Sequence, residues 1–129
     1  MSQSPACHRR ALIVEDEFIL ALDLEDAVFQ CGFDICDLAS TADRARSLAM
    51  DHRPDLVVMD VNLSGGREGI ETARWLRDVC EAPVVFVTSH TDASTVERIN
   101  ERLPGAPVLP KPVHRERFGR VVAEVAPTA

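Results

Sequence analysis

The sequence contains no apolar run near the ~18 residues that a membrane-spanning helix requires. It also shows no secretory signal ahead of its first strand-like segment. These two absences exclude membrane and secreted proteins. We therefore expect a cytoplasmic protein without a membrane partner.

Basic residues are too few for a typical nucleic-acid-binding protein. The chain has 14 Lys and Arg against 21 Asp and Glu, which gives a net charge of -7. Binding to nucleic acid requires a basic surface that displaces counterions from the phosphates. We therefore predict no DNA partner for this chain.

The four cysteines predict neither a zinc site nor a disulfide framework. None of them forms a C-x-x-C pair, and no histidine stands near a cysteine pair at zinc-ligand spacing. We expect Cys31, Cys36 and Cys80 to be reduced residues in or near the core, and Cys7 to belong to a loose tail.

Length and composition are those of one globular domain. With 129 residues, of which 46% are hydrophobic and 27% charged, the chain can bury a core without disulfides or metals. The polar stretch 1–10 has no periodicity and is expected to be a flexible tail. We place the folded domain at 11–125 and a short C-terminal tail at 126–129.

Short apolar runs alternate with amphipathic stretches along the domain. The runs are rich in β-branched residues, as buried parallel strands are, and comprise Ala11–Val14, Leu56–Met59, Val84–Val87 and Val108–Leu109. A weaker run, Phe33–Leu38, is interrupted by Asp34 and Asp37 and indicates an edge strand. Helical spacing of apolar residues predicts helices at 17–31 (stopped by Gly32), 41–51, 69–80, 92–103 and 113–125. Strand then helix, five times over, predicts an α/β fold with a five-stranded parallel sheet and helices on both faces.

Polar side chains follow the predicted strands, at the sheet edge where open α/β folds gather their functional residues. They are Glu15, Asp16, Asp60, Thr88 and Lys111. Like charges 4 Å apart at an effective dielectric of about 20 repel by roughly 4 kcal/mol, so three carboxylates need compensation. Lys111 offers part of it, and Mg²⁺, a hard cation that prefers oxygen ligands, would supply the rest. Such a pocket attracts a phosphoryl group, with Asp60 as the nucleophile and Thr88 as a hydrogen-bond donor.

Four segments at these strand ends resemble the receiver domain of bacterial two-component response regulators. They are Leu12–Glu17, Val58–Leu63, Val87–Ser89 and Pro110–Pro112, and the resemblance covers about 11–125. It implies a flavodoxin-like (βα)5 fold with strand order 2-1-3-4-5 and a receiver of the single-domain type. It also implies a cis peptide bond between Lys111 and Pro112.

The resemblance assigns the phosphoryl chemistry to three residues. Asp60 would accept phosphate from a histidine kinase or a histidine phosphotransfer protein, and Thr88 and Lys111 would bind the phosphoryl oxygens. The domain would then signal to an output protein through a contact that depends on phosphorylation. It would be a switch and not an enzyme, and its own chemistry would be limited to Mg²⁺-dependent self-phosphorylation from small donors and slow self-dephosphorylation.

The metal site and the phosphate lifetime are implied in the same way. Mg²⁺ would be held by Asp16, Asp60, the backbone carbonyl of Asn62 and, through water, Glu15. Asn62 and His90 would flank the attacking water and tune the lifetime of the phosphate.

Three positions depart from the usual pattern of the family. They are Val108, where an aromatic usually rotates on activation, Val113, where Phe is common, and Ser64–Gly66, where many receivers place a proline. Valine is stiff and has no ring, so we expect the switch to involve Thr88 and the loop 88–92 without an aromatic rotation. The helix 92–103, the last strand and the last helix form the expected surface for a partner or a homodimer.

Two other functions remain open at this point. A small Mg²⁺-dependent phosphohydrolase on a similar sheet needs a second acid two residues after its nucleophile, and this sequence has Asn62 there. A receiver that only binds partners would not need the acidic set or Lys111. Turnover of a phosphomonoester and phosphorylation of Asp60 separate these alternatives.

Overall fold

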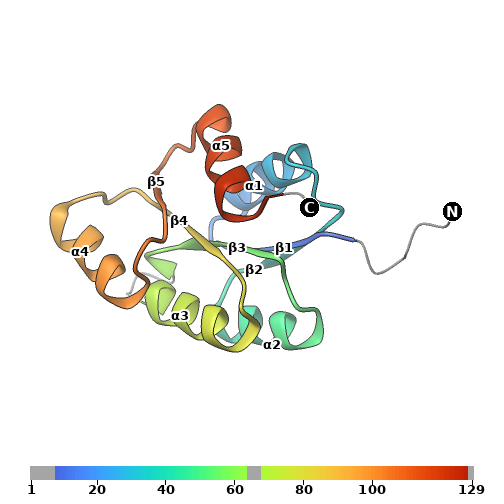
Figure 1. Ribbon diagram of the computed structural model, residues 1–129, viewed down its shortest axis with the longest axis horizontal. Coiled ribbons are helices and arrows are strands. Elements are labelled where there is room, and N and C mark those ends of the chain that lie inside the picture. The colour runs from blue at the N-terminus through green and yellow to red at the C-terminus, as the bar shows by residue number, and fades with distance from the viewer. Residues whose placement is uncertain (1–7, 64–67, 128–129) are drawn as a thin grey trace, which may run out of the picture.

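The computed structural model describes residues 8–63 and 68–127, which form one sheet flanked by helices (Figure 1). The strands are β1 (Arg10–Val14), β2 (Ile35–Ala39), β3 (Leu56–Asp60), β4 (Val84–Thr88) and β5 (Val108–Pro110). The helices are α1 (Phe18–Gln30), α2 (Ala42–Asp51), α3 (Glu68–Cys80), α4 (Ala93–Arg102) and α5 (Arg115–Val125). All strand pairs are parallel and the order is β2-β1-β3-β4-β5, which confirms the predicted fold class and places β2 at an edge.

The sheet lies between two helical layers. Helices α1 and α5 cover one face, and α2, α3 and α4 cover the other (Figure 1). Side chains of successive strand residues point to opposite faces, so Ile13 packs under α1 and α5 while Leu12 packs toward α2 and α3. Both faces are covered, which is why the central strands read as continuous apolar runs.

Local sequence signals explain where several helices begin and end. Thr41 accepts a hydrogen bond from the Arg44 N–H at 3.1 Å and so caps α2. Asp92 does the same for α4 through the Thr95 N–H at 3.2 Å. Gly32 follows α1 with a φ of 95°, which confirms its predicted role as a helix stop.

Strands β2 to β5 each end one residue later than predicted, and the starts of β1 and β2 also differ from the sequence prediction. The edge strand begins at Ile35 and not at Phe33, because the Phe33 N–H bonds back to the Val28 carbonyl and its ring is buried against the α1–α5 layer. Strand β1 begins at Arg10, a residue that we had expected in the N-terminal tail. The rest of that tail lies mostly outside the described residues, as does Cys7.

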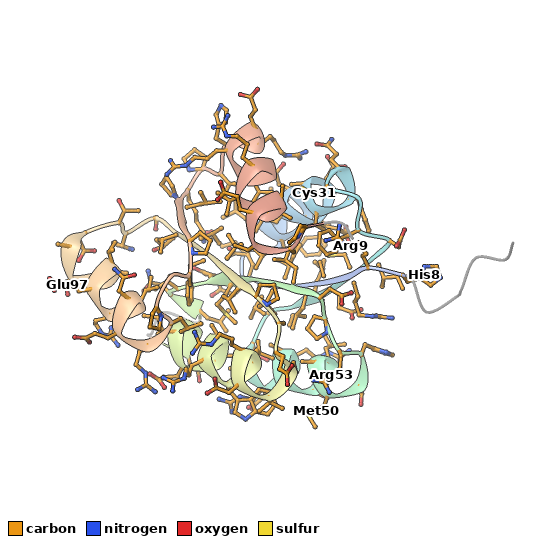
Figure 2. All side chains as sticks on the ribbon, viewed as in Figure 1. His8, Arg9, Cys31, Met50, Arg53 and Glu97 are labelled. Atoms are coloured by element: carbon orange, nitrogen blue, oxygen red, sulfur yellow. The ribbon has the colours of Figure 1, made fainter. Side chains whose placement is uncertain are left out.

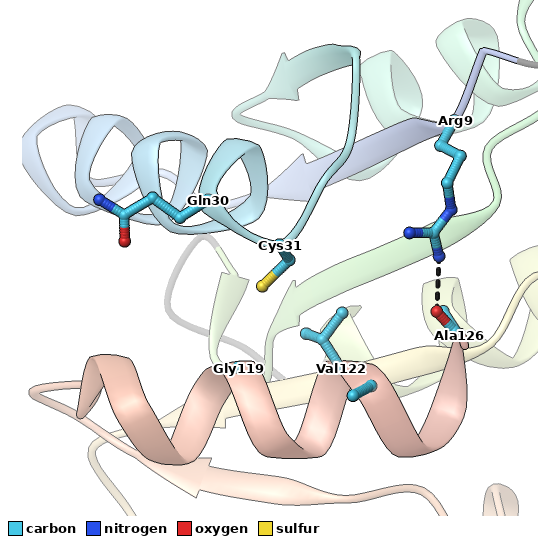
Figure 3. Close-up of a pocket in the computed structure, with 7 residues that line it drawn as sticks. Arg9, Gln30, Cys31, Gly119, Val122 and Ala126 are labelled. Carbon is cyan, nitrogen blue, oxygen red and sulfur yellow. Dashed lines mark hydrogen bonds between the residues drawn. The ribbon is translucent and has the colours of Figure 1, made fainter. Parts of the chain in front are cut away.

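At the amino ends of the strands, a residue just before β1 contacts a residue just after α5. The Arg9 guanidinium stacks over the Phe33 ring at 4.1 Å and donates to the Ala126 carbonyl at 2.5 Å. A cavity of about 280 Å³ lies beside this contact, between the C-terminal turns of α1 and α5 (Figure 3). It stands at the opposite edge of the sheet from the predicted site.

The three described cysteines carry free thiols, as predicted. Burial raises the pKa of Cys36 to about 12, and it also raises the pKa of Cys31 and of Cys80. Among the described residues, none of the helices has the length and apolar character needed to cross a membrane.

Candidate functional site

The carboxyl ends of three neighbouring strands bring polar side chains together. Glu15 directly follows β1, Asp60 ends β3 and Thr88 ends β4. The register pairs Val14 with Met59 and Asp60 with Val87, so these strand ends lie level with one another. Glu15, Asp60 and Thr88 are all buried, which is unusual for polar residues and indicates a functional arrangement.

Three carboxylates form a cluster at this edge. One oxygen each from Glu15, Asp16 and Asp60 lies within 4.8 Å of the others, and Asp16 is the exposed member. A set made only of carboxylate oxygens, open to solvent on one side, suits a hard divalent cation that keeps several waters. The residues present therefore fit the Mg²⁺ site that the sequence predicts.

Lys111 supplies positive charge to the same cluster. Its Nζ lies 2.9 Å from Glu15 Oε1, 3.4 Å from Asp60 Oδ1 and 4.0 Å from Glu17 Oε1. Burial alone would lower the pKa of Lys111, but the carboxylates of Glu15 and Asp60 raise it, so its ammonium stays charged. Burial raises the pKa of Glu15, and the hydrogen bond from Lys111 opposes this effect. One cation thus joins two buried acids.

Lys111 reaches the cluster from the loop between β5 and α5. Its backbone N–H donates to the Thr88 carbonyl at 2.9 Å, which ties the loop to the end of β4. The Lys111–Pro112 peptide bond is cis, as the resemblance implied.

Asn62 and His90 meet across the site. The Asn62 Nδ2 and His90 Nδ1 atoms lie 3.0 Å apart, and the Asn62 N–H donates to Asp60 Oδ1 at 3.1 Å. The sequence analysis predicted a role for both residues but did not predict the contact between them. A signal for it exists, because each residue stands two positions after the end of a strand and the two strands are neighbours.

Gly69 is a residue that the sequence reasoning missed. A Cβ atom there would lie 2.1 Å from the carbonyl oxygen of Asp60, so only glycine allows the first turn of α3 to approach the end of β3 this closely. The available signal was a glycine inside a predicted helix, which often marks a close backbone approach.

The remaining predicted residues lie outside the carboxylate cluster. Val108 lies on the edge strand β5, where it pairs with Phe86 of β4. It is half-buried and packs against the core beneath α2, α3 and α4. Val113 is half-buried against the α1–α5 layer. The segment Ser64–Gly66 lies outside the described residues.

A sequence model of the response regulator receiver domain matches residues 11–123 of this chain. The chain belongs to this family. Receiver domains are phospho-accepting signalling domains of two-component systems. In this chain the acidic cluster and Lys111 lie together at the carboxyl ends of the strands.

Curated relatives of this receiver domain are regulators of several kinds. The transcriptional regulatory protein PdtaR of Mycobacterium tuberculosis is 36% identical over 96 residues, covering 74% of this chain and 46% of PdtaR. The phyllosphere-induced regulator PhyR of Methylorubrum extorquens is 30% identical, covering 88% of this chain and 42% of PhyR. The receiver domain thus spans about half the length of these relatives. The polar-differentiation response regulator DivK of Brucella anthropi is 31% identical and is matched over 89% of its length, with 85% of this chain covered.

Solved structures show the same fold. The signal receiver domain of a modulated diguanylate cyclase from Desulfovibrio desulfuricans matches with a TM-score of 0.81 and 31% identity, over 92% of this chain and 94% of that one. The receiver domain of PhyR from Erythrobacter litoralis matches with a TM-score of 0.79 and 25% identity, over 98% and 99% of the two chains.

Proposed function

We propose that Asp60 accepts a phosphoryl group from a histidine kinase or a histidine phosphotransfer protein, and that the domain then signals by a changed protein contact. The observation that carries this proposal is the position of Lys111, whose Nζ lies within 3.4 Å of both Glu15 and Asp60 inside the acidic cluster. A cation held beside a buried carboxylate supports attack on a phosphoryl group, because it neutralises the charge that the phosphoryl oxygens bring.

The transfer itself is a displacement at phosphorus. An oxygen of Asp60 forms the new P–O bond while the P–N bond to the donor histidine breaks, and the imidazole leaves with the electron pair. Lys111 and the Thr88 hydroxyl bind phosphoryl oxygens. Bound Mg²⁺ would supply further neutralisation of these oxygens. Asp16, Asp60, the Asn62 carbonyl and, through water, Glu15 would hold it.

A protein donor must cover the entrance to Asp60 in order to reach it. Helix α1 begins two residues after Asp16 and presents apolar side chains to solvent: Phe18 is 67% exposed, Ile19 76% and Leu22 39%. Burying this surface would stabilise a complex in which the donor histidine stands over the site. We therefore assign donor docking to the first two turns of α1.

The phosphorylated domain would act on its output through another surface. We retain α4, β5 and α5 as the face for an output protein or a homodimer, since α4 follows the loop that begins directly after Thr88. Small phosphodonors would also phosphorylate Asp60, and Asn62 and His90 would tune its slow hydrolysis.

Intact-mass measurement after incubation with acetyl phosphate and Mg²⁺ tests this function. We expect the wild-type chain to gain the mass of one phosphoryl group, and the Asp60→Asn variant to gain none. The Asp51→Asn variant, changed at an exposed position at the end of α2, serves as the matched control and should behave as wild type.

Three outcomes would contradict the proposal. Equal labelling of the Asp60→Asn variant would place the acceptor elsewhere, and a wild-type chain without any labelling would favour a receiver that only binds partners. Repeated turnover of a phosphomonoester would favour the phosphohydrolase.

A further inference from the structure

The contact between Asn62 and His90 belongs to a longer set of hydrogen bonds. Asn62 donates its backbone N–H to Asp60 Oδ1, and its side chain meets the His90 ring at 3.0 Å. The His90 N–H donates to Thr88 Oγ1 at 3.0 Å, and Thr88 Oγ1 donates in turn to the His90 carbonyl at 3.3 Å. Asp60 and the hydroxyl of Thr88 are thus connected through the backbone N–H groups and side chains of Asn62 and His90.

The Thr88 hydroxyl has only one proton to donate. In this structure that proton is directed to the His90 carbonyl, so it cannot at the same time reach a phosphoryl oxygen on Asp60. Binding of the phosphoryl group by the Thr88 hydroxyl therefore breaks its bond to the His90 carbonyl, and movement of Thr88 Oγ1 toward Asp60 also breaks the bond from the His90 N–H. Any contact that fixes His90 in place opposes this change.

Few other interactions hold this loop. Residues 89–92 are exposed to solvent, and Asp92 already belongs to the cap of α4. The ring of His90 has a second, longer contact with Ser89 Oγ at 3.5 Å, but Ser89 lies in the same loop and cannot anchor it. Among the described residues, Asn62, in the turn that follows β3, is thus the side chain from outside the loop that holds the ring of His90.

We propose that the Asn62–His90 hydrogen bond is a latch that holds the loop 88–92 in the unphosphorylated arrangement and so resists loading of the site. This inference rests on the proposed function, because it concerns the readiness of Asp60 and Thr88 to take a phosphoryl group. It assigns Asn62 and His90 a joint role as positioning residues, separate from any effect on hydrolysis. Removing either partner breaks the same bond, so the two changes should not add.

Beryllofluoride, a phosphoryl mimic that is not consumed by hydrolysis, provides the test. We expect Asn62→Ala and His90→Ala each to tighten its Mg²⁺-dependent binding about two- to tenfold, the range for one hydrogen bond. The double variant should bind no more tightly than the tighter single variant. Asn62→Ala keeps the backbone carbonyl and N–H, and His52→Ala, an exposed histidine after α2, is the matched control.

Hydrogen exchange without Mg²⁺ or beryllofluoride gives a second reading of the latch. The amide of residue 90, whose N–H is bonded to Thr88, should exchange about two- to tenfold faster in either single variant, and no faster again in the double variant. His52→Ala should leave this amide unchanged.

Additive effects of the two single changes, or single variants that bind beryllofluoride as the wild type does or more weakly, would overturn the latch. A wild-type chain that neither binds beryllofluoride nor is phosphorylated would remove the proposed function, and the latch with it. The two failures are therefore distinguishable.

Discussion

Helices α1 and α4 both begin at the candidate site, yet they are built differently. Helix α1 buries four side chains in the core, namely Ala21, Leu24, Ala27 and Val28, whereas α4 buries only Ile99. On the solvent side the contrast reverses. Phe18, Ile19, Leu22 and Phe29 of α1 are exposed, while no large hydrophobic side chain is exposed among the described residues of α4, β5 and α5. Residues such as Glu97 project from α4 instead (Figure 2).

This difference in burial and surface character suits the two helices to different roles. A firmly anchored helix with an apolar outer surface can bind a partner without losing its own place on the sheet. A weakly anchored helix with a polar outer surface is suited to move, because segments with few buried contacts open at low free-energy cost. We therefore expect donor docking at α1 and phosphorylation-dependent change at α4.

The largest expected effect concerns the anchoring of the two helices. Leu24→Ala and Ile99→Ala should each lower the free energy of unfolding by about 2–5 kcal/mol, as is usual for buried aliphatic side chains. Ile99 is the single buried residue within α4, so its truncation should also loosen this helix locally. Chemical denaturation measures the global loss, and hydrogen exchange measures the local one.

The Ile99→Ala variant should show amide exchange that rises much more in α4 than in α1. Leu24→Ala should raise exchange across the whole domain without singling out α4. A uniform increase in both variants would mean that α4 is as firmly attached as α1.

A smaller effect is expected at the outer surface of α1. Ile19→Asp should slow phosphotransfer from a phosphorylated histidine phosphotransfer protein that loads the wild-type chain, by roughly 5- to 30-fold, the loss typical of an important interface residue. Phosphorylation by acetyl phosphate should not change. Asn100→Asp adds the same charge at an exposed position of α4 and should leave both rates unchanged.

Equal slowing by Ile19→Asp and Asn100→Asp would show that net charge, and not the apolar surface of α1, controls the transfer. Rates should be measured in single-turnover mode, so that binding and transfer can be separated.

The smallest expected effect concerns the ion pair that ties the end of α4 to α3. Arg102 Nη2 lies 2.8 Å from Glu71 Oε1, and both side chains are about half exposed. Glu71→Gln should lower the free energy of unfolding by at most about 1 kcal/mol, and less at high salt, because solvent screens exposed pairs. A loss above about 2 kcal/mol would show that this pair is a principal anchor of α4.

The fold was predictable because it depends on simple periodicity, and the residues of the candidate site could be proposed because they directly follow the predicted strands. A short apolar run rich in β-branched residues, such as Val84–Val87, indicates a strand buried on both faces, and parallel strands place the residues that follow them at one edge. Asp60, Thr88 and Lys111 were located on that basis, and the structure brings them to the same end of the sheet.

Features that depend on contacts between loops were not predictable. Phe33 looked like a strand residue because its hydrophobicity does not reveal that its N–H closes the end of α1. The bond between Asn62 and His90 depends on the strand register and on two turns at once. The need for glycine at position 69 follows from the approach of one backbone to another, which leaves no mark on hydrophobic patterning.

The bond between Arg9 and Ala126 has a practical consequence for how this domain can be combined with other proteins. It brings both ends of the folded unit to the edge of the sheet opposite Asp60 (Figure 3). A fluorescent reporter or a second domain joined next to Arg9 or Ala126 would start at the edge of the sheet opposite Asp60. Partners joined at these two residues would therefore leave the edge that holds Asp60 uncovered.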